Sequence, residues 1–440
     1  MIQLVIILAI AAGFFVVLVP SFAAIAVPLL FGVIFLRLLL VGLFPRTGNN
    51  ETTSRVAFWT YLAFALHLAI GLAVQLKMNG TEFLAAPDAQ HYHQGAMQIV
   101  RHWGGSGALP LMGRGKEGFY YLVAALYQVF GPRPVAGLIV NASLAAAVIP
   151  LVTSSTRRLF GIISPRYVAI PLFLMPSFLV WPSQLLREAG VLFFMAVVIH
   201  TAILLTERIT AARVVVGSLA MALLFTFRAP VGMVLAGTLL IALAFAQRSL
   251  VGGVGSSVAW LGLLAALVLG AGLGYSGYRW STQADISTLN QVQVGTAVGA
   301  GSGFFYDSEM STPLQAIGRL PISMARFAFG PFPWETPGIR QAPGLVETAL
   351  ILLLLPSLVR GLKKGWKLAG RKSFVLLLPA VFLAALLSLV VGNYGLLLRE
   401  RAQVTLLLIP FIALGLASRR EAVTLTSIQR VPTEDQLSPS

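Results

Sequence analysis

Residues 189–206 read AGVLFFMAVVIHTAILLT, an apolar run without a single Asp, Glu, Lys or Arg. A helix of this length is close to the roughly 20 residues that cross the hydrocarbon core of a bilayer. Similar runs recur along the 440 residues, of which 57% are apolar and only 10% are charged. Because soluble domains carry about 25% charged residues, this composition excludes a water-soluble globular enzyme. The alternating ten-residue pattern of outer-membrane barrels is missing, so the sequence predicts an all-α polytopic membrane protein.

About twelve transmembrane helices are expected, within a range of roughly eleven to fourteen. The first apolar stretch, 2–43, has twice the length of one crossing and is broken by Pro20 and Pro28, which predicts a tight helical hairpin. Two further segments, 118–131 and 314–330, are too short or too polar for a full span and are interpreted as half-inserted or interfacial helices. The expected spans are 2–19, 22–43, 56–76, 135–156, 166–182, 189–206, 213–227, 229–247, 254–275, 345–361, 373–392 and 403–418.

These spans divide the chain into five parts. An N-terminal helical hairpin, a membrane module with a long outer loop, a second long extracytoplasmic loop, a group of C-terminal transmembrane helices and a polar tail follow one another. Short interfacial helices are expected in the two long loops, and the tail is expected to be disordered. The boundaries are 1–44 for the hairpin, 45–275 for the module with its outer loop 77–117, 276–344 for the second loop, 345–420 for the C-terminal helices and 421–440 for the tail.

The formal net charge of +16 has an ordinary cause in a membrane protein, because Lys and Arg accumulate in cytoplasmic loops. With both termini in the cytoplasm, the inner loops hold most of the basic residues, and no nucleic-acid partner is expected. The apolar run continues past a weak cleavage-like site at Ala24-Ile25-Ala26, so no cleaved signal peptide is expected. The chain has no cysteine, which excludes disulfides, thiolate metal sites and a cysteine nucleophile.

The first outer loop holds a candidate acid–base group. Asp88 lies just outside a helix end and is followed by His91, Tyr92 and His93. A carboxylate in such a place can act as a general base, although a solvated loop acid has the same pattern. Asp88, His91 and His93 could also bind a divalent metal, but two histidines with one residue between them are a weak metal signature.

Two further charged groups lie at the outer ends of spans. Arg187 and Glu188 stand at the mouth of the span 189–206, where an ion pair is costly unless it has partners or lines water. Asn393, Arg399 and Arg401 follow the eleventh span, against the positive-inside bias. Guanidinium groups suit phosphate oxygens, while the alternatives are a structural ion pair and snorkelling to lipid headgroups. Arg228, Arg319 and Arg326 are weaker candidates of the same kind.

The order of these pieces resembles the GT-C superfamily of polytopic glycosyltransferases, including the family 39 and dolichyl-phosphate-mannose-type enzymes. The similarity is strongest over about 80–205. The pieces are Asp88…Tyr92…Ala96, Glu117-Gly-Phe-Tyr-Tyr-Leu…Tyr127-Gln-Val-Phe-Gly131, Asn141…Arg157-Arg-Leu-Phe-Gly161, Pro176…Trp181-Pro-Ser…Arg187-Glu188, Pro-Phe-Pro-Trp334-Glu335 and Gly392-Asn-Tyr-Gly…Arg399-x-Arg401.

The resemblance implies that 45–275 is a GT-C-like catalytic module that transfers a sugar from a polyprenyl-phosphate carrier to a glycan or lipid acceptor on the extracytoplasmic face. The family's first-loop acid is the catalytic base and corresponds to Asp88, and its second acidic motif corresponds to Glu188, so the resemblance implies that Asp88 and Glu188 are the catalytic residues. The first loop often has paired acids in the family, whereas Ala89 follows Asp88 here. Besides the lipid-linked donor no cofactor is certain, and a divalent metal is possible. The residues expected to bind substrate are His91, Tyr92, His93, Lys116, Glu117, Arg187, Asn393, Arg399 and Arg401.

The sequence therefore predicts a glycosyltransferase of the bacterial inner membrane that takes part in envelope polysaccharide or glycolipid assembly, with the lipid-linked donor, the acceptor and membrane lipids as partners. An O-antigen-type polymerase or ligase is the first alternative, since it would use outer arginines and need no acidic base. A transporter or flippase for a lipid-linked sugar is the second alternative. A transporter should carry ionisable residues at mid-span, whereas the polar groups here crowd the outer rim.

Overall fold

The computed structural model describes residues 20–44, 50–77, 87–110, 112, 115–161, 163–246, 286–306, 310–335 and 342–429. Over these residues the chain is all-α, with one isolated antiparallel bridge between Gly303 and Asn393 and no longer strand. The all-α polytopic architecture is therefore confirmed. The expected spans 2–19 and 254–275 lie outside the described residues.

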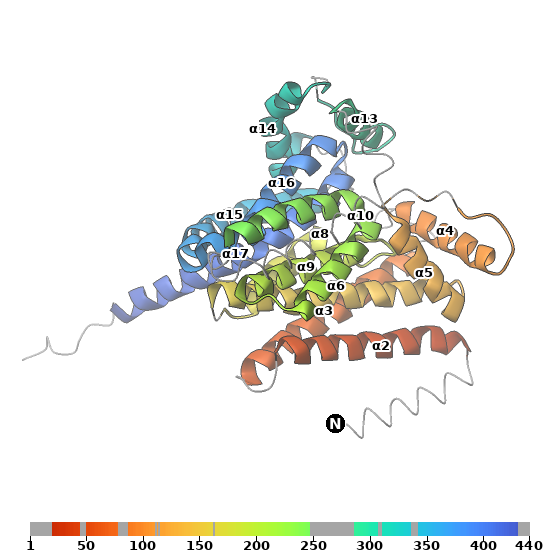
Figure 1. Ribbon diagram of the computed structural model, residues 1–440, viewed down its shortest axis with the longest axis horizontal. Coiled ribbons are helices and arrows are strands. Elements are labelled where there is room, and N and C mark those ends of the chain that lie inside the picture. Colours follow the sequence, from red (N-terminus) through yellow and green to blue (C-terminus); the bar gives the residue numbers. More distant parts are fainter. Residues whose placement is uncertain are drawn as a thin grey trace, which may run out of the picture.

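Seven segments of the described chain are long and apolar enough to cross a membrane. One of them, Ala342–Val390, joins two helices, α15 and α16. Helices α2 and α6 run nearly horizontally in Figure 1, and α17 runs obliquely to them from the lower left. The helices in these segments are α2 (Pro20–Leu43), α3 (Asn50–Lys77), α6 (Pro134–Phe160), α9 (Glu188–Glu207), α10 (Ala211–Ala246), α15 (Ala342–Ala369), α16 (Phe374–Val390) and α17 (Tyr394–Gln429).

Helix α10 is a hairpin of two antiparallel arms, 211–227 and 229–246. Arg228 between the arms has non-helical backbone angles (φ −160°, ψ 83°), and Pro230 follows, which suits the first turn of a helix. Val214 of the first arm and Leu243 of the second pack together with Leu205, as only a chain that folds back at Arg228 allows. The arms match the expected spans 213–227 and 229–247, and Arg228 occupies the tip.

Two expectations about helix boundaries are wrong. The expected span 166–182 is broken into α7 (Arg166–Leu174) and α8 (Pro176–Leu179), because Pro176 disfavours a helical conformation at the extended residue before it. The expected span 403–418 begins nine residues earlier, at Tyr394. Arg399 and Arg401 are therefore helical. Helix α17 also continues to Gln429, so the first residues of the expected tail 421–440 are helical too.

The two outer loops contain the short helices that the sequence predicts. The first loop holds α4 (Pro87–Trp103), and α5 (Glu117–Phe130) follows it; the second loop holds α13 (Ile286–Ala297) and α14 (Pro313–Phe329). With 14 residues, α5 is shorter than the roughly 20 residues of a full span. Two 3-10 turns, η2 (Pro333–Glu335) and η4 (Gly370–Ser373), complete the described elements.

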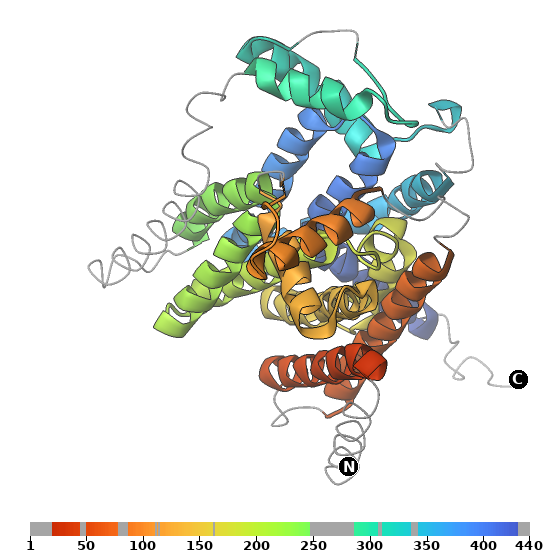
Figure 2. The ribbon, with the colours of Figure 1, turned by 90° about the vertical axis from the view of Figure 1, so that its right-hand side faces the viewer.

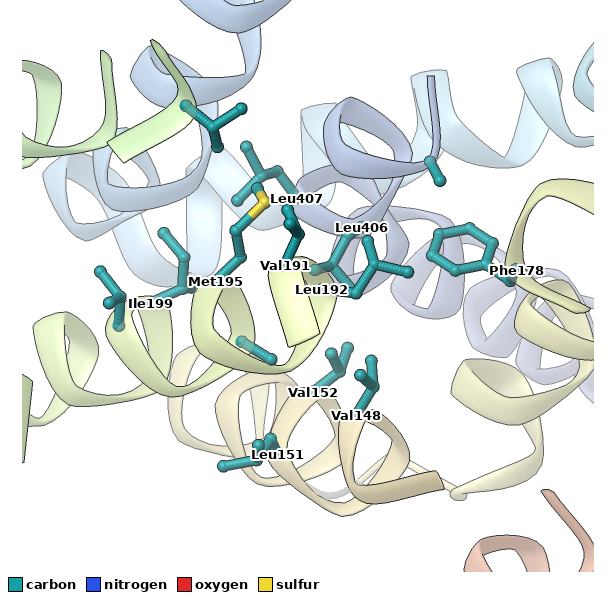
Figure 3. Packing of buried hydrophobic residues seen from close by; sticks show 14 of the residues in the cluster. Val148, Leu151, Val152, Phe178, Val191, Leu192, Met195, Ile199, Leu406 and Leu407 are labelled. Carbon is teal, nitrogen blue, oxygen red and sulfur yellow. The ribbon is translucent and has the colours of Figure 1, made fainter. Parts of the chain in front are cut away.

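The apolar core lies where α6, α9 and α17 meet. Val148 and Val152 of α6, Met195 of α9 and Leu406 and Leu407 of α17 interlock there (Figure 3). Close approach of α15 and α17 fixes the position of α17 from its other side. A Cβ atom added at Gly361 or Gly415 would collide with backbone of the opposite helix, and such small residues allow membrane helices to pack closely. The middle of α17 is therefore packed tightly against α15.

Candidate functional site

Five charged residues far apart in the sequence converge at one end of the bundle because each lies at a helix end. Asp88 is the second residue of α4, Lys116 directly precedes α5, and Glu188 is the first residue of α9. Arg228 occupies the tip of the α10 hairpin, and Arg399 lies in the second turn of α17. Helix N-termini carry partial positive charge and favour anions, so three of these ends add to the field of the side chains.

Arg399 is the centre of this cluster. Its Nη1 donates a hydrogen bond of 2.7 Å to Asp88 Oδ2, and its Nε lies 3.6 Å from Glu188 Oε1. The guanidinium carbon also lies 5.2 Å from the ring centroid of Trp181, within range of a cation–π interaction. The Arg399 side chain is only 12% exposed, while that of Asp88 is 45% exposed. The Asp88 carboxylate is therefore partly open to solvent, and the more deeply buried Arg399 donates a hydrogen bond to it.

A second guanidinium group approaches the same carboxylate oxygen of Glu188. Arg228 Nη1 lies 4.0 Å from Glu188 Oε1, and Arg228 Nη2 donates to Glu400 Oε1. Gln403 Nε2 in turn donates to the other oxygen of Glu400 at 2.9 Å. Glu188 is buried between Arg228 and Arg399 and balances part of their charge.

Several buried polar atoms of this cluster have no hydrogen-bond partner within the described part of the chain. They are Arg228 Nη1, Arg399 Nε and Nη2, and Glu188 Oε2. An unsatisfied buried donor costs about 1–3 kcal/mol, and more when it is charged. Arg228 Nη1 and Arg399 Nε both lie near Glu188 Oε1 but beyond hydrogen-bond distance. Guanidinium N–H groups without hydrogen bonds are the type of donor that binds phosphate and carboxylate oxygens. The cluster is therefore a candidate anion site next to a carboxylate.

Arg187 and Lys116 stand beside this anion site. Arg187 Nη1 donates to the backbone oxygens of Gly115 (3.3 Å) and Phe227 (3.1 Å), which ties the start of α5 and the tip of the α10 hairpin to the start of α9. Burial lowers the pKa of Lys116, as does the nearby charge of Arg187, while Asp88 opposes this effect.

The electrostatic environment keeps Asp88 ionised. Burial alone would raise the pKa of its carboxyl group, but the charge and hydrogen bond of Arg399 outweigh burial, with help from Lys116 and Arg187, and the pKa is lowered. Asp88 is thus a carboxylate at neutral pH and can accept a proton. Tyr92 has the opposite behaviour, since burial raises the pKa of its hydroxyl and keeps it protonated. Its ring packs at 4.8 Å from that of Phe119.

The remaining first-loop residues do not join the cluster as ligands. His91 is exposed, and His93 Nδ1 forms a 2.7 Å hydrogen bond with the Tyr127 hydroxyl. Among the residues described, no group of three or more His, Asp or Glu side chains has an arrangement that could hold a metal ion. Glu117 Oε2 accepts a 2.9 Å hydrogen bond from the Lys116 backbone nitrogen at the start of its own helix.

Arg401 lies elsewhere, which corrects the expectation that it shares a site with Arg399. Two residues along a helix correspond to a rotation of about 200°, so the two side chains leave opposite faces of α17. Arg401 Nε donates to Phe327 O at 2.8 Å, its Nη2 donates to Gly330 O, and its Nη1 lies 3.8 Å from Glu347 Oε1. Arg401 therefore ties the end of α14 to α15 and α17.

Asn393 also has a local structural contact. Its Nδ2 donates to Thr296 O at 2.6 Å, and its Oδ1 accepts from the Leu396 nitrogen at 2.8 Å, so it caps α17 and anchors α13. Arg228, a weaker candidate by its sequence, and Glu400, which the sequence does not single out, both join the cluster. A signal for Arg228 was present, because the triplet Arg228-Ala-Pro230 stands alone between two apolar arms.

Fold and site together define a polytopic membrane protein with a buried arginine–carboxylate cluster at one end of its helix bundle. No protein-family model matches the chain, and no curated protein matches it. Among solved structures, the chain is similar to the crystal structure of ArnT from Cupriavidus metallidurans bound to undecaprenyl phosphate, with a TM-score of 0.39 and 12% sequence identity, over 87% of this chain and 82% of that chain. So low a TM-score and identity define neither a shared site nor a shared activity.

Proposed function

We propose that this protein is an integral membrane glycosyltransferase that moves a sugar from a polyprenyl-phosphate donor to a glycan or lipid acceptor on the extracytoplasmic face. One observation carries the proposal. The ionised Asp88 carboxylate is held at 2.7 Å by Arg399. Nε and Nη2 of Arg399, together with Arg228 Nη1, are buried without a hydrogen-bond partner in the described part of the chain. A base and an anion site thus lie side by side at the end of a membrane bundle.

The arginines suit the leaving group of this reaction. When the bond between the anomeric carbon and the phosphate oxygen breaks, negative charge grows on the lipid phosphate. Fixed N–H donors in a site of low dielectric stabilise such charge, and removing one donor of this kind typically costs about 100- to 1,000-fold in rate. Arg228 and Arg399 would bind the phosphate, and Glu188 between them limits their mutual repulsion. The carrier's prenyl chain would remain among the apolar helices and lipid.

Asp88 suits the other half of the reaction. Its carboxylate would take the proton from the acceptor hydroxyl while the hydroxyl oxygen attacks the anomeric carbon, and general-base catalysis of this kind typically contributes about 100- to 10,000-fold. With 45% of its side chain exposed, Asp88 can meet an acceptor that arrives from water. Glu188 is buried between Arg228 and Arg399, so we assign it to charge balance and the proton transfer to Asp88 alone.

The two rival functions use the same cluster differently. An O-antigen-type polymerase or ligase would use the arginines and need no base, which leaves the low-pKa Asp88 without a task. A transporter for a lipid-linked sugar needs ionisable groups along the path through the bilayer, whereas all members of this cluster lie at helix ends on one face.

The proposal also places the protein in the bacterial inner membrane with cytoplasmic termini, in envelope polysaccharide or glycolipid assembly.

Replacement of the base tests the proposal. In membranes supplied with an undecaprenyl-phosphate sugar and acceptor, Asp88→Asn is expected to lower the transfer rate by about 100- to 10,000-fold. Glu207→Gln is the matched control, because Glu207 pairs with Arg158 at the far end of α9, and it should transfer normally. Wild-type rates for Asp88→Asn would exclude the base and favour the polymerase reading.

A further inference from the structure

Helices α13 and α14 of the second outer loop form a small unit whose polarity is inside out. Gln293, Arg319 and Ser323 are buried, with exposed fractions of 1%, 4% and 0%. Large apolar side chains of the same unit point outward, and Leu314 and Ile317 are 78% and 62% exposed. Val292, Val298, Phe305 and Ile322 are also exposed apolar residues of this unit. Together with Leu314 and Ile317 they form what we call the apolar face.

Several of the buried polar side chains of the unit bond to one another or to its backbone. Arg319 donates to Asn290 Oδ1 at 3.1 Å and to Gln293 Oε1 at 3.4 Å. Its guanidinium carbon lies 4.0 Å from the ring centroid of Tyr306, and Gln293 Nε2 donates to Phe304 O at 3.0 Å. The polar side chains of the unit thus face one another inside it, and an apolar exterior of this kind would be costly in water.

The attachment of this unit fixes its depth relative to the membrane spans. The Phe304 nitrogen donates to Gly392 O at 2.7 Å, and the Tyr394 nitrogen donates to Ser302 O at 3.1 Å. Both bonds lie in the turn where one candidate span ends at Val390 and the next begins at Tyr394, which is the level where hydrocarbon meets water. The views show the unit along one side of the bundle, away from α2 (Figure 2).

We propose that the apolar face is embedded in the lipid of the outer leaflet, so that α13 and α14 form a lateral, lipid-immersed extension of the bundle. A lipid surface suits this face because polar groups are sequestered inside the unit and apolar ones cover its outside, the distribution found in protein surrounded by hydrocarbon. Trp334 adds a second observation. It is 80% exposed and stacks on Phe332 with centroids 5.0 Å apart, and tryptophan is enriched at the membrane–water boundary. This inference is independent of the proposed activity.

Nitroxide labels on the cysteine-free chain test this proposal. Full-length Ile317→Cys and Ile322→Cys proteins would each be labelled and reconstituted in vesicles of phosphatidylcholine and phosphatidylglycerol. For each label, the collision rate with oxygen would be compared with the collision rate with a water-soluble nickel chelate. Leu353→Cys is the lipid control, since Leu353 is 72% exposed on α15 within a candidate span. Ala108→Cys, on an exposed coil of the first outer loop, is the aqueous control.

The proposal predicts that labels at both isoleucine positions collide more often with oxygen than with the nickel chelate, as the label at Leu353 does, and that the label at Ala108 shows the reverse. Labels at Ile317 and Ile322 that behave like the label at Ala108 would overturn it. Low collision rates with both reagents, together with dipolar broadening between copies, would also overturn it, because a second copy of the chain would then cover the face.

Discussion

Replacement of Arg399 by lysine separates a phosphate-binding guanidinium from a simple positive charge. Arg399 uses Nη1 for Asp88 at 2.7 Å and has Nε and Nη2 free of hydrogen bonds. A lysine ammonium has one point of charge and cannot hold Asp88 and a phosphate oxygen in the same planar fork. Loss of one charge-assisted hydrogen bond is worth about 1.5–3 kcal/mol, which corresponds to an increase in Kd of roughly 10- to 150-fold.

The assay is the titration of detergent-purified protein with undecaprenyl phosphate. The matched control is Arg158→Lys, because Arg158 also pairs with a carboxylate, Glu207 at 2.8 Å, but is 39% exposed and lies at the other end of the bundle. Arg399→Lys keeps the charge, so its unfolding midpoint should stay close to that of the wild type. An unchanged Kd in Arg399→Lys, or an equal loss in Arg158→Lys, would refute the assignment of Arg399 to the phosphate.

Two further predictions concern proton transfer and the support of the second loop. Because the pKa of Asp88 is lowered, the transfer rate should persist as the pH falls through the ordinary titration range of aspartate, and it should drop only below that range. Lys116→Met removes a positive charge that lowers the pKa of Asp88, so the acid limb of the pH–rate profile should move to higher pH. An acid limb that does not move would contradict the assignment of Asp88 as the base. Arg401→Met leaves Glu347 buried without its ion-pair partner and should lower the free energy of unfolding, measured with denaturant, by about 3–5 kcal/mol. The double variant Arg401→Met with Glu347→Leu should recover most of this loss of stability. Equal losses in the single and double variants would contradict the pairing of Arg401 with Glu347.

Much of the fold and part of the site follow from the sequence because hydropathy and topology are strong signals. Alternating spans return every second loop to the same side, so Asp88, Glu188 and Arg399 could be assigned to one face before their contacts were known. The structure brings all three together. The break before Pro176 was less visible, because 166–182 is apolar throughout, and hydropathy does not report where the backbone leaves the helix.

The residues that sequence reasoning misplaced depend on helix phase and on side-chain direction. Arg399 and Arg401 look like a pair only if they lie in a loop; once α17 begins at Tyr394, a spacing of two residues puts them on opposite faces. His91 and His93 diverge for the same reason on α4. Arg228 lies near Glu188 because the hairpin turn brings the tip of α10 to the start of α9. The sequence around Arg228 marks the turn but does not show which distant residue the tip contacts.

A structure of the wild-type protein in lipid nanodiscs with added undecaprenyl phosphate would test the central claim most directly. We expect the phosphate group within hydrogen-bond distance of both Arg228 and Arg399, with the Asp88 carboxylate next to it and open to water. A phosphate bound at another surface, with the cluster of Arg228, Glu188 and Arg399 unchanged, would contradict it.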